Sequence, residues 1–362
     1  MTTILFVAGL VLLGLLVVDV HSTVFIPRGQ PGPISRRFYG ASWRIWKRIS
    51  ERLPERRRRI FLAQLGPILV PMTVIVWGTL LVSSFALMYA PWVGQFEISP
   101  EKSGPMPDWA LAFYYSGYSA VTLGVGDVVP NGTVPRLIAV IEAATGLTLF
   151  TVSITYLLSV YNARNESAGL SVAISRFVGR SEGDDPVSLL IGVARSSAAE
   201  GIGDWLGEVA FELATLVEMR GQFPLLHYFH EPNDDRAVPV ALSELMELIT
   251  LCRSLLDPER YPALAAGPTV RAVERLGVHY LSEFEWKDRK DEDVLRKRRR
   301  RHYESARSRF EKAGLLLRAD DEAWERFDRI SARWDLPDQH MREWLEYCPV
   351  DADLPDPQED KL

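Results

Sequence analysis

Residues 113–127 read FYYSGYSAVTLGVGD, and they decide how the rest of the chain is interpreted. The apolar stretch that contains their first part, residues 109–121, is too short to cross a bilayer as a helix. Gly124 and Gly126 stand at alternate positions and permit backbone conformations in which successive carbonyl oxygens point the same way. Non-helical backbone at membrane depth is tolerated only where it is buried in protein or lines a water-filled path. The stretch therefore predicts a re-entrant segment beside a pore.

Two longer apolar stretches flank this segment. Residues 61–92 precede it and are long enough to span a bilayer with some tilt, and Pro67 and Pro71 are expected to bend their cytoplasmic end. Several prolines then mark an external loop. The order of segments predicts an outer helix at 61–92, a pore helix at 109–121, an extended strand at 122–127 and an inner helix at 136–163.

Another apolar run begins the chain. Residues 4–18 are unbroken, and the run extends to about residue 26 if Asp19 and His21 lie near the membrane interface. This length suits a spanning helix of about 20 residues. The alternative is a cleaved signal peptide, but no Lys or Arg precedes the run and no clear small-residue cleavage site follows it. We assign residues 1–26 to an N-terminal membrane helix.

Residues 27–60 form a basic segment between the first two apolar runs. Ten Lys or Arg and only two acids lie between Arg36 and Arg59, with aromatic residues among them. The pattern predicts an amphipathic helix on a membrane surface, with anionic lipid as a candidate partner. A solvated linker would explain the charge but not the aromatics. Basic loops stay cytoplasmic, so the N-terminus is expected outside and the C-terminal half in the cytoplasm, in a cell (inner) membrane.

With its flanking spans, the strand at 122–127 resembles the selectivity filter of the potassium-channel family. The resemblance covers roughly residues 61–164. It implies an all-α membrane protein, a tetrameric pore-loop channel with three membrane helices per chain and a helical cytosolic C-terminal domain. Four chains would surround one axis, because one loop per chain cannot enclose a path. K⁺ would pass down its gradient as the only bound ion, and no cofactor or catalytic residue is implied.

The resemblance assigns roles to individual residues. The filter would consist of Thr122, Leu123, Gly124, Val125, Gly126 and Asp127, with K⁺ held at the carbonyl oxygens of the first four. Asp127 would lie behind the filter at its outer mouth, and Tyr114 and Tyr115 stand where the family has aromatic residues that brace it. The family usually has Tyr or Phe at the position of Val125, so the filter lacks that ring. Tyr118 is the candidate to replace it.

The inner helix carries further candidates. Gly146 stands where many members of the family place a hinge. Leu147, Phe150, Ile154 and Leu158 share one helix face, which would line the cavity below the filter or pack against another helix. Glu142 is an ionisable residue within the span, where such a group is costly without a partner. It is interpreted either as a gating or permeation carboxylate or as a structural hydrogen-bonding group.

Residues 165–362 differ in composition from the front of the chain. They carry 27 Lys or Arg against 39 Asp or Glu, whereas residues 1–164 carry 14 against 8. The net acidic charge argues against a nucleic-acid partner. Apolar residues recur at helical spacing, which predicts a mainly helical cytosolic domain. The two cysteines, Cys252 and Cys348, are interpreted as reduced thiols.

This half carries several weaker signals. Gly201 and Gly203 lack the third glycine and the preceding strand of a dinucleotide-binding turn. His227, His230 and Glu231 are possible metal ligands, but a surface or core histidine pair is the simpler interpretation. The basic run 296–301 predicts a solvated helix or, alternatively, an anionic-lipid site. No set of nucleophile, base and orienting group predicts an enzyme, and the gating ligand stays unknown.

Two other functions remain open from the sequence. A weakly selective cation channel would follow if the filter without an aromatic ring at Val125 discriminates poorly between ions. A non-conducting tetrameric membrane sensor would follow if the pore region only holds four chains together. Steep voltage gating is not expected, because the spans lack regularly spaced arginines.

Overall fold

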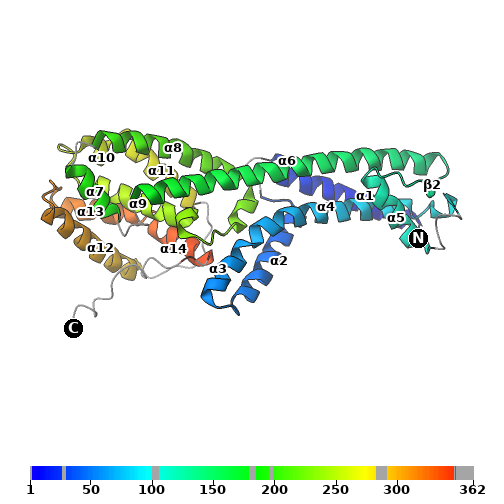
Figure 1. Cartoon of the computed structure of the whole chain (residues 1–362), viewed down its shortest axis with the longest axis horizontal. Helices are drawn as coiled ribbons and strands as arrows, with labels where there is room; N and C mark the ends of the chain where they lie inside the picture. The colour runs from blue at the N-terminus through cyan, green and yellow to red at the C-terminus, as the bar shows by residue number, and fades with distance from the viewer. Residues whose placement is uncertain are drawn as a thin grey trace. The chain divides into compact units, whose positions relative to one another are not determined.

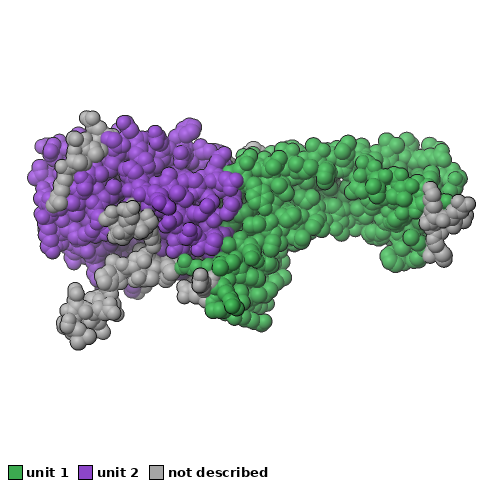
Figure 2. Space-filling model, viewed as in Figure 1, with its two compact units in different colours: residues 1–163, 220–229 green, residues 164–219, 230–362 purple. Residues whose placement is uncertain are grey.

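The computed structural model describes residues 2–26, 30–99, 106–178, 185–195, 199–282, 292–345 and 347 (Figure 1). The chain divides into two compact units (Figure 2). Unit 1 consists of residues 1–163 and 220–229, and unit 2 of residues 164–219 and 230–362. Most of the described residues are helical, as the sequence predicts.

Unit 1 is built on long apolar helices. α1 (Thr2–Val20) continues as a π-helical turn (His21–Phe25) and is followed later by α4 (Leu65–Tyr89) and α6 (Thr133–Val178). Within the described residues, the stretches Thr2–Phe25, Arg57–Tyr89 and Thr133–Val178 are long and apolar enough to cross a membrane. The structure therefore has three candidate membrane helices, which is the number that the sequence predicts.

The first helix packs along the outer helix of the pore region (Figure 1). At their contact, a Cβ atom on Gly9 of α1 would lie 2.7 Å from Cγ of Met88 on α4. Glycine thus lets the two backbones approach closely, as small residues do between membrane helices. α1 is part of unit 1 and does not stand apart from it.

The basic segment forms two helices where one is expected. α2 (Pro33–Ser50) and α3 (Glu55–Ala63) are separated at Pro54, which has no N–H and cannot continue a helix interior. Asp19 at the end of α1 holds the start of α2. Its Oδ1 accepts hydrogen bonds from the N–H groups of Ile34 at 2.7 Å and Ser35 at 3.0 Å. A carboxylate is favourable there because it pairs with N–H groups that the helix leaves unsatisfied.

A short helix and a small β-ladder complete one end of unit 1. α5 (Asp108–Ala120) lies between α4 and α6 in the sequence. β1 (Phe96–Ile98) pairs antiparallel with β2 (Val128–Pro130), with Phe96 opposite Pro130 and Ile98 opposite Val128. The ladder pairs the segment that follows α4 with the segment that follows residues 122–127.

Residues 220–229 return from the C-terminal half to unit 1 as a loop with a 3-10 helix (Pro224–Tyr228). The Tyr228 ring lies 5.9 Å from that of Tyr39 and 6.2 Å from that of Trp43 on α2. A Cβ atom on Gly66 of α4 would lie 2.6 Å from the Phe229 ring. This differs from the expected boundary at residue 164, which assigns the whole of 165–362 to a separate cytosolic domain.

Unit 2 is a helical domain built around one buried helix. α9 (Val238–Ser254) has side chains with no solvent exposure on several faces, as expected of a helix at the centre of a domain. Its neighbours in contact are α7 (Pro186–Arg195), α10 (Pro262–Ala266), α11 (Pro268–Ser282), α13 (Asp320–Ser331) and α14 (Asp335–Trp344). α8 (Ala199–Gln222) and α12 (Glu292–Lys312) complete the described helices of this half.

Candidate functional site

The strand after α5 has an unusual backbone. Thr122, Gly124 and Gly126 have φ angles of 56°, 60° and 75°, while Leu123 and Val125 between them keep negative φ. Alternation of positive and negative φ allows successive peptide groups to turn to the same side. Thr122 is the only non-glycine residue with positive φ in the described part of the chain. Such strain concentrates at functional sites, where the surrounding structure holds it.

Two tyrosines of α5 hold the C-terminal end of this strand. The Tyr114 hydroxyl donates to Oδ2 of Asp127 at 2.9 Å, and the Tyr118 hydroxyl donates to the carbonyl of Val128. Asp127 is 6% exposed, whereas residues 122–126 before it are exposed in the single chain. Tyr115 makes no such bond to the strand. Its ring packs edge-on against Tyr89 of α4 at 5.0 Å, so it braces α5 from behind.

The β-ladder adds a second restraint that the sequence did not indicate. The Ser99 N–H donates to the backbone carbonyl of Asp127 at 2.8 Å, next to the pairing of β1 with β2. Strands of three residues give no recognisable alternation in the sequence, and Pro130 in β2 argues against a strand. The only sequence signal was the position of both segments at the external ends of neighbouring spans.

Glu142 of α6 is fully buried, and its carboxylate joins three helices. It accepts hydrogen bonds from the Tyr89 hydroxyl of α4 at 2.7 Å and from the Ser116 hydroxyl of α5. Ser116 also contacts the carbonyl of Val82 on α4, at 2.9 Å. This is the geometry that the structural interpretation of Glu142 requires.

Gly146 lies where α6 meets the C-terminal end of α5. A Cβ atom at this position would overlap the carbonyl group of Ala120, so only glycine permits the contact. Close approach of backbone is therefore a sufficient reason for glycine here. The candidate role as a hinge stays a prediction.

The predicted lining stripe of α6 faces away from the packed core of the chain. Leu147, Phe150, Ile154 and Leu158 are 60%, 62%, 46% and 56% exposed. A hollow of about 590 Å³ between α4, α5 and α6 is lined by Val121 and Thr122 as well as by Leu147 and Phe150. Ile154 and Leu158 do not line it. The first two of the four side chains thus come together with the inner end of the strand.

The candidate metal ligands of the C-terminal half are engaged elsewhere. His227 accepts a hydrogen bond from Nε of Arg220 at 3.0 Å and lies 2.9 Å from the Pro224 carbonyl. Burial and the Arg220 charge lower the pKa of His227 to about 3, so its ring is neutral. His230 stacks on Tyr347 at 4.5 Å. Within the residues that the structure describes, no group of three or more His, Cys, Asp or Glu side chains is placed to hold a metal.

The basic run 296–301 is only partly the solvated helix that was expected. Arg299 is 5% exposed and pairs with Asp328 and Asp335, both at 2.8 Å, and with Glu292. Arg300 follows the simpler expectation, with an i, i+4 ion pair to Glu304 at 2.7 Å. Cys252 is buried as a free thiol, and burial raises its pKa to about 12; Cys348 lies outside the described residues.

Comparison with known proteins supports a channel. Residues 69–163, from α4 to the middle of α6, match a family described as ion channels. The chain is also similar to an uncharacterized membrane protein, YdjJ, of Bacillus subtilis (strain 168), with 29% identity over 255 residues. This alignment covers 70% of the present chain and 71% of YdjJ, so it extends beyond the region that matches the channel family. No solved structure matches the chain. The matches thus support a membrane protein, and residues 69–163 indicate an ion channel and not an enzyme.

Proposed function

We propose that this chain is one subunit of a homotetrameric, potassium-selective channel that conducts K⁺ passively. The observation that carries the proposal is the alternation of φ at Thr122, Gly124 and Gly126. This alternation directs neighbouring carbonyl oxygens to one side of an exposed strand. Four such strands around an axis would replace the hydration shell of K⁺ with rings of carbonyl oxygens. A single re-entrant loop cannot enclose a path, so the proposal requires four chains.

Selectivity depends on how firmly the filter is held. Val125 offers its carbonyl but no aromatic ring to tether the strand to the pore helix. In our proposal the bond from Tyr118 to the Val128 carbonyl takes over that tether, together with the bond from Tyr114 to Asp127. A weakly selective cation channel is the alternative if these bonds do not stiffen the strand enough.

Residues 220–229 support gating through the C-terminal half. The segment packs against unit 1, and the chain enters it from unit 2 at residue 219 and returns to unit 2 at residue 230. Phe223 packs 6.1 Å from Tyr156 on α6, while Tyr228 packs on α2. A rearrangement within unit 2 would move this segment and with it the inner part of α6. The stimulus that starts the rearrangement is not defined by these contacts.

The basic helices support a role at the membrane surface. On α2, Tyr39 and Trp43 are buried, whereas Ile45 and Ile49 are 59% and 43% exposed and stand beside the exposed Arg44 and Arg48. Exposed apolar and cationic side chains on one helix suit the boundary of a bilayer with anionic lipid. In our proposal the segment between Arg36 and Arg59 lies on the cytoplasmic surface of the cell membrane. The N-terminus is then outside and unit 2 is in the cytoplasm.

The test is K⁺ against Na⁺ flux into liposomes that contain the purified full-length chain. Gly124→Asp is expected to abolish flux, because Gly124 has a φ of 60° and any side chain there is strained. Gly94→Asp is the matched control. Gly94 is an exposed external glycine without a positive φ, and a Cβ atom there would have no neighbour within 4 Å. This control is expected to conduct like the wild type.

The outcomes separate the three functions. Flux that prefers K⁺ and is lost only in Gly124→Asp supports the proposal. Equal K⁺ and Na⁺ flux, lost in the same variant, establishes the weakly selective channel. A tetramer that conducts neither ion under any condition points to the membrane sensor and overturns the proposal.

A further inference from the structure

Two helices of unit 2 carry charges of opposite sign on their exposed faces. On α8 these are Asp204, Glu208 and Glu212, which recur every four residues and therefore lie along one face. All three are exposed, and none makes an ion pair with another described residue. Like charges four residues apart on a helix repel each other, so this acidic stripe disfavours α8 in an isolated chain.

An aromatic ring stands within the acidic stripe. Phe211 is 76% exposed, the largest value among the large apolar side chains of the described residues. It follows Asp204 by seven residues and Glu208 by three, so it lies on the same face of α8. Carboxylates around an exposed ring suit a partner with cationic side chains, because Lys or Arg can pair with the acids and stack on the ring.

α12 presents a face of this kind. Lys297, Arg301 and Lys312 form a basic stripe along one side of the helix. All three are exposed, and none has an ion pair with another described residue. Val294, which is 62% exposed, lies about one turn before Lys297 on the same face. The basic stripe thus offers both the cations and an apolar contact that the face of α8 calls for.

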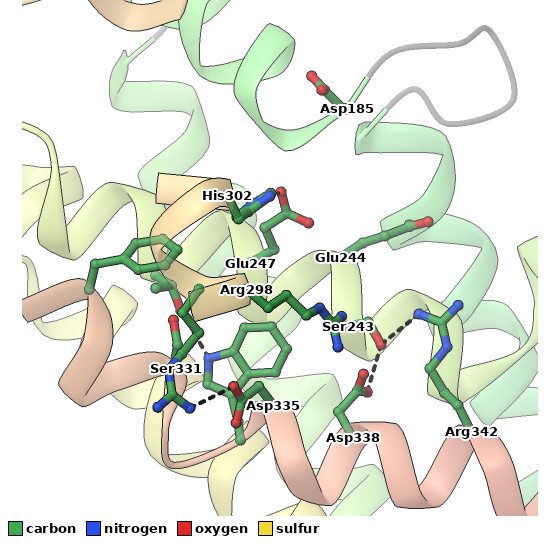
Figure 3. Close-up of a pocket in the computed structure, with 14 residues that line it drawn as sticks. Asp185, Ser243, Glu244, Glu247, Arg298, His302, Ser331, Asp335, Asp338 and Arg342 are labelled. Carbon is green, nitrogen blue, oxygen red and sulfur yellow. Dashed lines mark hydrogen bonds and ion pairs between the residues drawn. The ribbon is translucent and has the colours of Figure 1, made fainter. Parts of the chain in front are cut away.

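The opposite face of α12 is occupied within unit 2. Arg298 and His302 line a cavity of about 230 Å³ between α9, α12, α13 and α14. Figure 3 shows Arg298 extended toward Ser243 of α9. Arg299 forms ion pairs with acids of α13 and α14. These contacts hold α12 by its inner face, and the basic stripe is left on the outside.

The two stripes do not meet within one chain, because α8 and α12 lie on different sides of unit 2 (Figure 1). A stripe also fails to fit its own kind in a second copy, because like charges would then face each other. The fit is therefore between α8 of one copy and α12 of another. Such a head-to-tail contact uses two different surfaces of each chain and can repeat around a closed ring.

We propose that unit 2 of each chain docks on unit 2 of the next, with the acidic stripe of α8 against the basic stripe of α12. The inference rests on the proposed tetramer and adds a second interface to it. Exposed ion pairs are individually weak, but weak contacts suffice between units that an assembly already holds close together. In such a ring every acidic stripe meets one basic stripe.

The test is cross-linking of the full-length chain in detergent, after light scattering has measured its mass. Thr215→Cys and Ser305→Cys place thiols one turn after Phe211 and one turn after Arg301, in a chain that carries Cys348→Ser and keeps its buried Cys252. A bis-maleimide is expected to give covalent dimers, trimers and tetramers only when both thiols are present. Either thiol alone is expected to give monomers, because a head-to-tail contact never joins two copies of the same stripe.

Charge reversal makes the test specific. In the two-thiol chain, changing all three acids of the acidic stripe to Lys, or all three cations of the basic stripe to Glu, is expected to lower the yield of cross-links about fivefold or more. Both reversals together are expected to restore the yield, whatever the register of the two helices. Glu259→Lys and Arg329→Glu reverse exposed charges outside α8 and α12 and are expected to leave the yield unchanged.

The outcomes separate this inference from the channel proposal. Cross-links that need both thiols and return when both stripes are reversed support it. A tetramer without cross-links, or with equal cross-links from either thiol alone, overturns this inference and leaves the proposed channel standing. A monomeric chain overturns both. Cross-links that form in detergent but not in liposomes of anionic lipid would assign the basic stripe to the membrane surface and also overturn the inference.

Discussion

The two units bury their charged groups with different partners. In unit 1 the buried carboxylates Asp19, Asp127 and Glu142 accept the described hydrogen bonds from Tyr, Ser and Trp side chains and from backbone N–H groups. In unit 2 several buried charges meet opposite charges. Arg299 binds three acids, and Glu274 binds Arg253 and Arg333.

The difference fits the surroundings that we propose for each unit, the membrane for unit 1 and the cytoplasm for unit 2. A Lys or Arg brought into a membrane-spanning region would add a second costly charge, whereas a hydroxyl, indole or amide donor costs far less to bury. A water-exposed domain can supply long cationic side chains from its surface and bury only their ends. The buried carboxylates of unit 1 thus act as crosslinks between helices. Those of unit 2 belong to ion-pair networks.

The largest effect is expected from a substitution that breaks an ion-pair network in unit 2. Arg299→Gln is expected to lower the free energy of unfolding of unit 2 by about 3–5 kcal/mol, because three carboxylates lose one buried guanidinium. Arg296→Gln, which removes a 61% exposed arginine from the same helix, is expected to cost about 0.5 kcal/mol or less. Labelling of the buried Cys252 thiol in denaturant, in a chain that carries Cys348→Ser, measures both. Equal losses of unfolding free energy in the two variants would show that burial does not determine how much these ion pairs stabilise unit 2.

The next largest effect is expected from a substitution at Asp19, which is surrounded by neutral hydrogen-bond donors of unit 1. Asp19 accepts four hydrogen bonds, from Ile34 N–H, Ser35 N–H, the Ser35 hydroxyl and the Trp77 indole. Asp19→Asn replaces one acceptor with a donor and is expected to cost about 2–4 kcal/mol. Glu51→Gln, the same chemistry at an exposed residue after α2, is the control. Circular dichroism melts in detergent compare them, and the comparison of the two units fails if Asp19→Asn melts like the wild type.

The last predicted effect is a dependence of the stability of unit 2 on pH. Burial raises the pKa of Asp338 from 3.8 to about 6, despite the nearby Arg342 charge and the bond from Ser243. Between pH 3.8 and about 6 the folded state binds this proton more tightly than the unfolded state. Stability therefore falls as pH rises through that window, by about 3 kcal/mol in total, and is level above it. Cys252 labelling at several pH values measures the decline, and Asp338→Asn is expected to remove it.

Asp185 is the control for this prediction, because its pKa is shifted in the opposite direction. Burial disfavours its charge, but the hydrogen bonds from Arg309 and Ser188 outweigh burial and lower its pKa below 3.8. Its contribution to stability is present above pH 3.8 and is lost as pH falls below that value. Asp185→Asn is therefore expected to leave the decline between pH 3.8 and 6 unchanged. A decline that survives Asp338→Asn would assign it to another group.

The sequence was sufficient for features that depend on composition along the chain. Three apolar runs of membrane length predicted the three long helices, and the short aromatic run with two glycines predicted a channel region, which the ion-channel match at 69–163 confirms at the level of the family. Pro54 also marked the break between α2 and α3, although one helix was expected. Local signals of this kind need no knowledge of the partner.

The remaining features depend on partners far away in the sequence. Asp19 and Glu142 were visible as isolated acids in apolar runs, but Trp77 lies 58 residues from Asp19 and Tyr89 lies 53 from Glu142. The β-ladder and the cavity of unit 2 give no local pattern. The aromatic residues of 220–229 read as an ordinary stretch of a charged, helical region, so nothing pointed to their contact with α2 and α4. Long-range packing decides these features.

The return of residues 220–229 to unit 1 sets an order for biogenesis. The spans of unit 1 are synthesised and can enter the membrane before this segment leaves the ribosome, yet Tyr39 and Trp43 gain Tyr228 as a neighbour only afterwards. Unit 1 is therefore completed by a later portion of the chain. A polypeptide that stops at residue 178 would contain the three described candidate spans but would never carry the segment that packs against Tyr39 and Trp43.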